Sequence, residues 1–345
     1  PGEFIGIAVG LGFMAIAYFS DFTLIGKYPK AIYISILVLS IVTLEISPIL
    51  NGRAFYAQFM TLLFPIAFAA ILYAMRNKGY MGIILCGLSY LLPAYIAIRI
   101  PVTSGFLLFT VSGLILISIG IARNRFGVRR LWGYLLVFVP TVLVLLLATV
   151  RMPSLWVRLR VAIDPSIDTL GSGWRSFAVR WLLSASKLFG RGDMPPEYES
   201  SLLPFPKKQM DTDLLLTYLI YKFGWIVFIV IMALLLFFII RGFMLCLRQK
   251  SSLGLFVSAS IMLTFTMEVV TYVAFSLGFQ FTAPIALPLI SYGRIADMIN
   301  LFLIGIMLSV FRTGDIVNDK AANIISDDSF ITWSVGKLII AFVRR

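Results

Sequence analysis

The strongest constraint on the fold of this chain is a succession of apolar runs that approach the thickness of a bilayer. One of them reads "GWIVFIVIMALLLFFII" and contains no charged residue. A membrane-spanning helix needs about 20 such residues, and backbone polar groups in lipid must bond internally, so only helices or a closed barrel fit. Barrel strands would alternate in polarity at every second residue, and these runs do not. We therefore predict an all-α fold, a polytopic membrane helical bundle.

The breaks between the runs indicate how the chain crosses the membrane. The breaks "DFTLIGKYPK", "RNKGY", "RNRFGVRR" and "RGFMLCLRQKSS" are rich in Lys and Arg, whereas "NGR" and "RIPVTSG" carry fewer. Basic short loops stay in the cytoplasm, so Pro1 is expected outside, with one earlier helix before it. The nine expected spans are 4–20, 31–50, 54–75, 81–100, 101–122, 131–150, 214–240, 253–279 and 291–311.

The composition limits the chemistry. Histidine is absent, and Cys86 and Cys246 fall in or beside apolar runs. This excludes a histidine base, a histidine metal site and a thiol metal motif, and leaves carboxylates as the plausible bases. The formal charge of +13 indicates basic cytoplasmic loops and contact with anionic membrane lipids rather than nucleic acid.

The predicted organisation is a membrane domain, 1–312, followed by a cytoplasmic tail, 313–345. The membrane domain contains one long extracytoplasmic loop, 151–212. The tail ends in "DDSFITWSVGKLIIAFVRR", whose apolar stretch is too short to span a bilayer. We expect it to form an interfacial helix anchored by Lys337, Arg344 and Arg345.

A second amphipathic segment lies inside the long loop. The sequence "WRSFAVRWLLSASKLFG" places Phe177, Trp181, Ala185 and Leu188 on one helical face. This pattern predicts an interfacial helix on the outer leaflet. The same helix could wall a site for an amphiphilic substrate, and the two interpretations are compatible.

Four ionisable residues fall within or beside the apolar runs: Glu45, Lys222, Glu268 and Asp297. Such residues are expensive to keep in lipid and are functional candidates by default. Glu45 lies near the outer end of its helix, where it reaches the interface. Glu268 lies mid-helix, so we expect it to be protonated or paired with Lys222 or Arg294. A structural ion pair and a substrate role both remain open.

The stretch "DTDLLLTYLIYKFGW" places Asp213 at the mouth of an apolar run. One interpretation is structural: Asp211 or Asp213 caps a helix N-terminus, where free N–H groups and the helix dipole favour a carboxylate. The other is functional, with the carboxylate serving a site at the membrane face. The residues by themselves leave both open.

Three separated segments resemble one family, the SEDS (shape, elongation, division and sporulation) proteins, which are RodA/FtsW-like peptidoglycan polymerases. The segment "RLRVAIDPSIDTLGSGW", followed by "LFGRG", is similar to the family's Arg…Asp/Asn-Pro…Asp…Gly-x-Gly-aromatic run and later Gly-x-Gly. "DTDLLLTYLIYKFGW" is similar to its Thr-Asp-Phe segment, with Phe223-Gly224 at the family's spacing. "IALPLISYGRIADMINLFLIGIMLSVFR" resembles its Leu-Pro-Phe-x-Ser-Tyr-Gly-Gly-Ser-Ser signature. The resemblance covers roughly residues 31–312.

This resemblance implies a ten-helix protein of the bacterial cytoplasmic membrane that polymerises lipid II in elongation, division or sporulation. Its usual partner is a single-pass class B penicillin-binding protein. A carboxylate base, aligned with Asp213, deprotonates the acceptor sugar hydroxyl, which displaces undecaprenyl pyrophosphate from the donor with inversion. No cofactor is certain, and a divalent cation near the pyrophosphate stays open. The substrate-binding candidates are Arg160, Arg191, Thr212, Glu268, Pro288, Ser291, Tyr292, Gly293 and Arg294.

The sequence also departs from the family pattern. The paired acids expected before Phe223 are Tyr221 and Lys222, and the expected Gly-Gly-Ser-Ser reads "GRIA". Only Gln58 remains of the Gln-Pro-Ser-Glu…Lys motif, and "IPVTSG" lacks the Asp of the Pro-Asp-Leu-Gly motif. Two alternatives therefore stay open. The chain could transport a lipid-linked sugar, as Glu268 and Lys222 suggest, or it could be a catalytically weak scaffold of a cell-wall complex.

Overall fold

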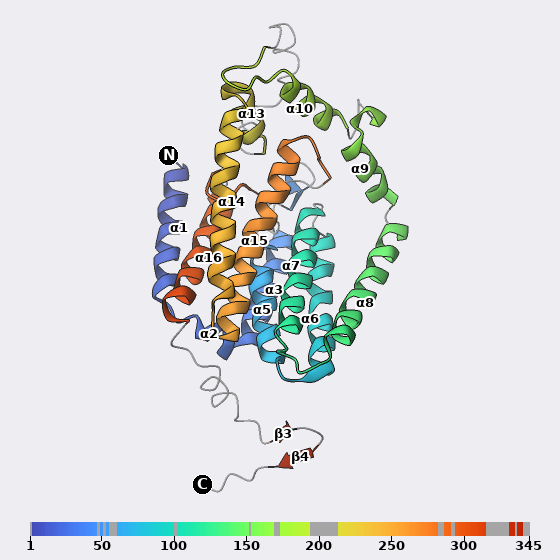
Figure 1. The fold of residues 1–345 in the computed structure, drawn as a ribbon, viewed down its shortest axis with the longest axis vertical. Helices are drawn as coiled ribbons and strands as arrows, with labels where there is room; N and C mark the ends of the chain where they lie inside the picture. Colours follow the sequence, from blue (N-terminus) through green and yellow to red (C-terminus); the bar gives the residue numbers. More distant parts are fainter. Residues whose placement is uncertain are drawn as a thin grey trace.

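The computed structural model describes residues 2–46, 49–50, 53–54, 61–99, 103–151, 153–168, 173–193, 213–281, 286–290, 294–314, 331–334 and 337–340. At several helix ends, including Arg294, only the backbone is described. The fold is a helical bundle with two short hairpins, and the body consists of helices whose axes are roughly aligned (Figure 1).

Among the described residues, nine helices form this body, in agreement with the nine expected spans. Five are long and apolar enough to cross a membrane, and four have shorter apolar segments. The long ones are α6 (Gly79–Arg99), α7 (Thr103–Ala122), α14 (Trp225–Leu247), α15 (Ser252–Ser276) and α16 (Arg294–Thr313). The other four are α1 (Gly2–Phe19), α3 (Pro29–Ile46), α5 (Phe64–Met75) and α8 (Arg130–Arg151), whose apolar segment covers Arg130–Leu143.

Helix α15 is the centre of the bundle, and α14 lies at its rim. The apolar window of α15 is 89% buried, whereas that of α14 is 6% buried. Several hydroxyls on α15 bond within the helix: for example, Ser258 donates to the carbonyl of Gly254 at 2.6 Å, and Thr264 donates to that of Ser260 at 3.1 Å. Internal bonding lets these polar side chains sit in a helix surrounded by other helices.

Helix α1 lies along α16 at the edge of the bundle (Figure 1). The two backbones approach closely at Gly305, where a Cβ would collide with the carbonyl oxygen of Met14 and lie 2.8 Å from Cβ of Ala17. Small residues at such crossings let membrane helices pack tightly.

The two ends of the bundle differ. One end carries α2 (Thr23–Lys27) and the basic connections 76–78, 123–129 and 248–251 (Figure 1). The other carries α9 (Pro153–Ile163), η2 (Pro165–Asp168), α10 (Trp174–Ser184) and α13 (Leu215–Phe223). All the loops expected to be cytoplasmic therefore lie at the end opposite to the described part of the long loop.

Two expectations about local structure are wrong, and a third is confirmed in part. Of the span expected at 54–75, Ala54 belongs to the hairpin of β1 (Ile49–Leu50) and β2 (Arg53–Ala54), η1 (Thr61–Leu63) and α5 are helical, and 55–60 lie outside the described residues. Pro65 in the first turn of α5 fits this start, because proline suits the beginning of a helix. The span expected at 214–240 is broken at Gly224. The tail contains an antiparallel hairpin, β3 (Ile331–Ser334) and β4 (Lys337–Ile340), instead of a helix, because β-branched and aromatic residues favour strands.

Candidate active site

The segment after Asp213 is a short helix that ends in a sharp break. Helix α13 ends at Phe223, and Gly224 adopts φ 94° and ψ 170° before α14 begins at Trp225. This backbone region is essentially restricted to glycine. A Cβ on Gly224 would also lie 2.5 Å from the carbonyl oxygen of Leu188. The break therefore needs glycine for two independent reasons, and Asp213 does not head a continuous membrane helix.

The N-cap position of α13 does not fall on Asp213, and Asp211, the other expected cap, lies outside the described residues. The N-cap residue of α13 is Leu214, and it makes no side-chain capping bond. Asp213 stands one residue further out and is half-buried. The phenol oxygen of Tyr272 on α15 accepts hydrogen bonds from the backbone N–H groups of Leu215 and Leu216. The carboxylate of Asp213 interacts electrostatically with the same phenol. Tyr272 thus takes part of the capping role and lies within electrostatic reach of the carboxylate.

A further hydrogen bond fixes α13 against the C-terminal end of α15. The hydroxyl of Thr217 donates to the carbonyl of Ser276 at 2.7 Å, in a buried position. Ser276 lies one turn after Tyr272 on α15. Its partner Thr217 lies two residues after Leu215, the partner of Tyr272, on α13. The two helices therefore run alongside each other in the same direction. The chain then reverses at Gly224, and α14 runs along the rim of the bundle toward its opposite end (Figure 1).

We call the region formed by α9, α10, α13 and the C-terminal end of α15 the outer assembly. An apolar cluster joins α10, α13 and α15 within it. Its buried members are Ala178, Val179, Leu183, Leu214, Leu216, Ile220, Val269, Tyr272, Phe275 and Leu287. The expected helix is present as α10, and it packs on α13 through Ala178, Val179 and Leu183. Phe177 and Leu188, expected on the face turned to the membrane, are 46% and 59% exposed, and Leu188 lies beyond the end of α10.

The "LFGRG" segment pairs with the end of α13. The N–H of Gly190 donates to the carbonyl of Phe223 at 3.1 Å, and that of Gly192 donates to the carbonyl of Tyr221 at 2.8 Å. A Cβ on Gly192 would lie 2.7 Å from the Tyr221 ring. Arg191, between the two glycines, is exposed. The Gly-x-Gly pattern therefore places Arg191 near the end of α13, about 12 Å along the helix from Asp213.

Arg180 was not among the expected site residues, yet it joins three elements. Its guanidinium donates to the carbonyls of Ala162 at 2.6 Å and Ile163 at 3.0 Å, at the end of α9. It also lies over the ring of Phe279, 4.7 Å from its centre. Carbonyls at a helix C-terminus lack partners within the helix, so Arg180 fixes α9 against α10 and the end of α15.

Helix α9 carries the candidate Arg160 in its last turn, where the side chain is exposed. Directly after α9, the carboxylate of Asp164 accepts hydrogen bonds from the backbone N–H and the hydroxyl of Ser166, at 3.0 and 2.5 Å. These bonds lower the pKa of Asp164. The "DPS" sequence thus forms a turn that a side chain stabilises. The end of α9, which carries Arg160, is fixed by this turn and by the bonds from Arg180.

Glu268 lies deep between α15 and α16. It is fully buried and accepts a hydrogen bond from the side-chain amide of Asn300 at 3.4 Å, with Asp297 within electrostatic reach. Lys222 is not its partner: its side chain is exposed and its ammonium lies 5.5 Å and 5.3 Å from the ring centres of Tyr218 and Phe223. The side chain of Arg294, the other expected partner, lies outside the described residues.

The last motif is described only in part. Pro288 is buried, next to Leu287 of the apolar cluster, and Leu289 adopts φ 61° in the turn that follows. A positive φ is uncommon for leucine and marks a constrained turn. Thr212, Ser291, Tyr292 and Gly293 lie outside the described residues, as do Asp211 and the side chain of Glu45. No group of three or more potential metal ligands occurs in the described part of the chain.

Comparison with known proteins decides the family. The FtsW/RodA/SpoVE cell cycle protein model matches residues 3–315. The chain belongs to this family. Its solved structural neighbours include a chain from "Structural coordination of polymerization and crosslinking by a peptidoglycan synthase complex", with TM-score 0.64 and 18% identity, covering 90% of this chain and 89% of that one. A mutant of the rod shape determining protein RodA of Thermus thermophilus gives TM-score 0.60 and 14% identity, covering 90% and 87%.

Curated relatives in the family match over shorter stretches. A probable peptidoglycan glycosyltransferase FtsW of Trichlorobacter lovleyi is 28% identical over 153 residues, 44% of this chain and 39% of the relative. Peptidoglycan glycosyltransferase MrdB of Escherichia coli is 25% identical over 153 residues, 44% and 40% of the two chains. The match thus spans less than half of these relatives. Family membership and the apolar helices together make this chain a multi-pass membrane protein.

Within the FtsW/RodA/SpoVE fold, the expected site residues divide into two groups. Asp213, Arg160, Arg191 and Pro288 belong to the outer assembly formed by α9, α10, α13 and the end of α15. Glu268 lies deeper, one turn before Tyr272 on α15, and faces Asn300. Tyr272, Arg180 and Asn300 were missed by sequence reasoning. The only sequence signal was that they are polar residues inside or beside apolar runs, which did not indicate their partners.

Proposed function

We propose that the chain is an inverting peptidoglycan glycosyltransferase that polymerises lipid II at the outer face of the bacterial cytoplasmic membrane. The observation that carries the proposal is the placement of Asp213. It is half-buried, it is not the N-cap of α13, and it sits beside Tyr272 in a chain of the FtsW/RodA/SpoVE family. Names of relatives such as peptidoglycan glycosyltransferase MrdB support the same reaction class.

In the proposed reaction, the Asp213 carboxylate takes the proton of an acceptor sugar hydroxyl. The freed oxygen forms a bond to the anomeric carbon of the donor. The bond from that carbon to the pyrophosphate oxygen breaks, and undecaprenyl pyrophosphate leaves with the electron pair and with inversion. A positioned base of this kind typically contributes about 10²- to 10⁴-fold in rate.

Basic side chains on the same outer assembly would stabilise the leaving pyrophosphate. Arg160 and Arg191 are exposed there, at the end of α9 and beside the end of α13. Arginine forms two parallel hydrogen bonds with phosphate oxygens, and charge that develops in the transition state gains most from such donors. Thr212, Ser291, Tyr292, Gly293 and Arg294 complete the proposed substrate contacts, and a divalent cation beside the pyrophosphate is compatible with them.

Orientation and partner belong to the same proposal. The basic loops lie together at the end of the bundle opposite to α9, α10 and α13 (Figure 1), which supports a cytoplasmic position for those loops and the tail. A single-pass class B penicillin-binding protein is the proposed partner. One of the structural neighbours comes from a peptidoglycan synthase complex, which is consistent with that assignment.

The transport alternative loses one of the two observations that motivated it. Those observations were the ionisable residues Glu268 and Lys222 within the apolar runs. Lys222 is instead exposed at the end of α13, and Glu268 bonds to Asn300. The scaffold alternative and the enzyme proposal predict different results, because a scaffold would form no glycan chains.

The experiment is lipid II polymerisation by the purified chain, with and without a transpeptidase partner. Asp213→Asn should abolish glycan chains at unchanged expression and thermal stability. Asp211→Asn, which removes the neighbouring acid, is the matched control and should retain product. Equal product from Asp213→Asn and the native chain would refute the proposal. No product from the native chain under either condition would favour the scaffold.

A further inference from the structure

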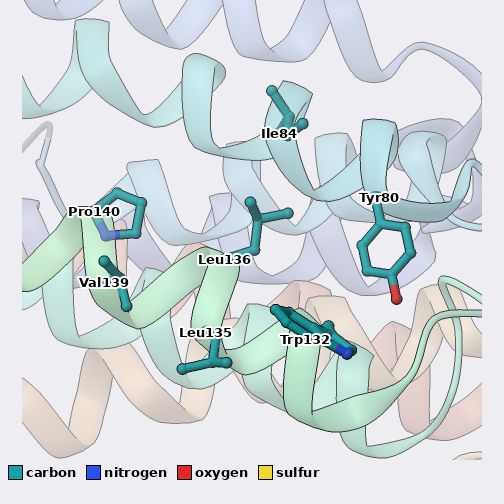
Figure 2. A pocket seen from close by; sticks show the side chains of 7 residues that line it. All are labelled: Tyr80, Ile84, Trp132, Leu135, Leu136, Val139 and Pro140. Carbon is teal, nitrogen blue, oxygen red and sulfur yellow. The ribbon is translucent and has the colours of Figure 1, made fainter.

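An apolar groove opens between α6 and α8, away from the outer assembly. Its volume is about 560 Å³, and its walls include Tyr80, Ile84, Trp132, Leu136 and Val139. Figure 2 shows the side chains of α6 facing those of α8 across this space, with the Tyr80 and Trp132 rings near one another. Tyr80 is 44% exposed and Trp132 is 58% exposed. The groove therefore opens to the surroundings of the bundle, which for these helices is lipid.

The groove is confined to one half of the membrane. Tyr80 is the second residue of α6, and Trp132 is the third residue of α8. From Trp132 to Pro140, α8 rises about 12 Å, less than half of the ~30 Å hydrocarbon core. A partner helix would need a surface along the whole span, whereas a lipid chain occupies one leaflet. Tyr and Trp at this depth are typical of the membrane interface.

Three basic residues directly adjoin the helix starts that line the groove. Lys78 precedes α6, Arg129 precedes α8 and Arg130 is the first residue of α8; all three are exposed and make no ion pair with another described residue. The N–H of Asn77 donates to the carbonyl of Arg125 at 2.9 Å, so the two loops that carry these charges are held together. No Asp or Glu occurs between Glu45 and Asp164 in the sequence, so this stretch of chain offers no counter-charge.

We propose that this groove binds one anionic phospholipid. An acyl chain lies against Ile84, Leu136 and Val139, and the phosphate lies among Lys78, Arg129 and Arg130. Apolar burial alone would accept any lipid, but the three basic groups select a negatively charged one. Each Lys or Arg near a membrane surface strengthens binding of anionic lipid by about fivefold. The site is separate from Asp213 and does not depend on the proposed polymerase activity.

The test uses Trp132 as a probe that lines the groove. The full-length chain is placed in phosphatidylcholine nanodiscs, and phosphatidylglycerol with a dibrominated acyl chain is titrated in to quench tryptophan fluorescence. The Trp132 contribution is the difference between the native chain and Trp132→Phe. We expect half-maximal quenching of this component at a mole fraction at least tenfold lower than for brominated phosphatidylcholine.

Three variants separate the contribution of the basic groups from that of the apolar groove. Lys78→Gln/Arg129→Gln/Arg130→Gln should abolish the preference for phosphatidylglycerol. Arg241→Gln/Arg248→Gln/Lys250→Gln removes three exposed basic groups at the same end of the bundle but on the α14 side, and should keep it. Leu136→Phe, which fills the groove with the charges intact, should weaken quenching by both lipids.

Three outcomes would overturn the assignment. Equal quenching by the two brominated lipids would mean an ordinary lipid-facing surface. A preference that survives loss of the three groove charges would place the anionic lipid elsewhere. A Trp132 component that neither lipid reaches would mean that another protein chain, or a second copy, covers the groove.

Discussion

The side-chain amide of Asn300 on α16 donates to the carboxyl group of Glu268 on α15, with Nδ2 3.4 Å from Oε1. Both residues are fully buried. The second carboxyl oxygen of Glu268 and the amide oxygen of Asn300 have no further partner among the described residues. A charged carboxylate in such surroundings is expensive, so the contact needs the shape and polarity of Glu268 rather than a negative charge.

Replacement of Glu268 tests this contact. Glu268→Gln should keep the melting temperature of the detergent-purified chain, because an amide retains the hydrogen bond without a charge. Glu268→Ala should destabilise the chain by about 1–3 kcal/mol, because the Asn300 amide is left buried without a partner. Thermal unfolding of the two variants distinguishes them. Equal stability of the Ala and Gln variants would contradict the role of this pair.

The break at Gly224 should not tolerate a side chain. Gly224→Ala combines a backbone conformation that costs about 1–3 kcal/mol for other residues with a Cβ only 2.5 Å from the Leu188 carbonyl oxygen. We expect a lower melting temperature and loss of lipid II polymerisation, because the reversal between α13 and α14 sets the position of Asp213. Gly87→Ala is the control: its Cβ meets no atom within 4 Å in α6, so it should be neutral or slightly stabilising. A Gly224→Ala chain with native activity would show that the break is not needed.

Tyr272→Phe should reduce both catalysis and stability. The variant keeps the ring in the apolar cluster but removes the oxygen that faces the N–H groups of Leu215 and Leu216 and the charge of Asp213. Loss of one buried acceptor costs about 1–3 kcal/mol. We expect kcat to fall at least tenfold with a small change in KM for lipid II. The interpretation fails if kcat is unchanged while the melting temperature drops.

Arg160, in the last turn of α9, and Arg180, in the middle of α10, should respond differently to substitution. Arg180→Gln removes the bonds to the carbonyls of Ala162 and Ile163. A hydrogen bond from a charged donor contributes about 1.5–3 kcal/mol to the free energy of unfolding. Its melting temperature should fall. Arg160→Gln changes an exposed side chain, so we expect native stability and a raised KM for lipid II. Thermal unfolding and steady-state kinetics on both variants check this contrast, which a raised KM with loss of stability in Arg160→Gln would contradict.

Much of the membrane architecture was predictable because the bilayer imposes a local rule. A run of about 20 apolar residues has few alternatives to a helix, whatever its neighbours do. The nine helices of the body and the grouping of basic loops at one end followed from this rule and from charge counting. The same reasoning missed the break at Gly224, since an apolar run gives no sign of a reversal that depends on the approach of Leu188.

The sequence indicated which residues belong to the site but not which residues they contact. The family resemblance selected Asp213 over Asp211, and the glycines of "LFGRG" over others, but it did not give their contacts. That Leu214 rather than Asp213 is the N-cap depends on where α13 docks on α15. That Lys222 is exposed depends on the direction of α13, which Thr217 and Ser276 set together.

The sequence by itself thus determined that this protein is a helical membrane bundle with a carboxylate after its one long loop, because hydropathy and charge act locally along the chain. The tertiary structure decided which polar groups meet: Asp213 with Tyr272, Arg180 with the end of α9, and Glu268 with Asn300. These pairs join residues 18 to 59 positions apart. Inside lipid a buried polar group is stable only with a partner, and that partner comes from whichever helix packs beside it.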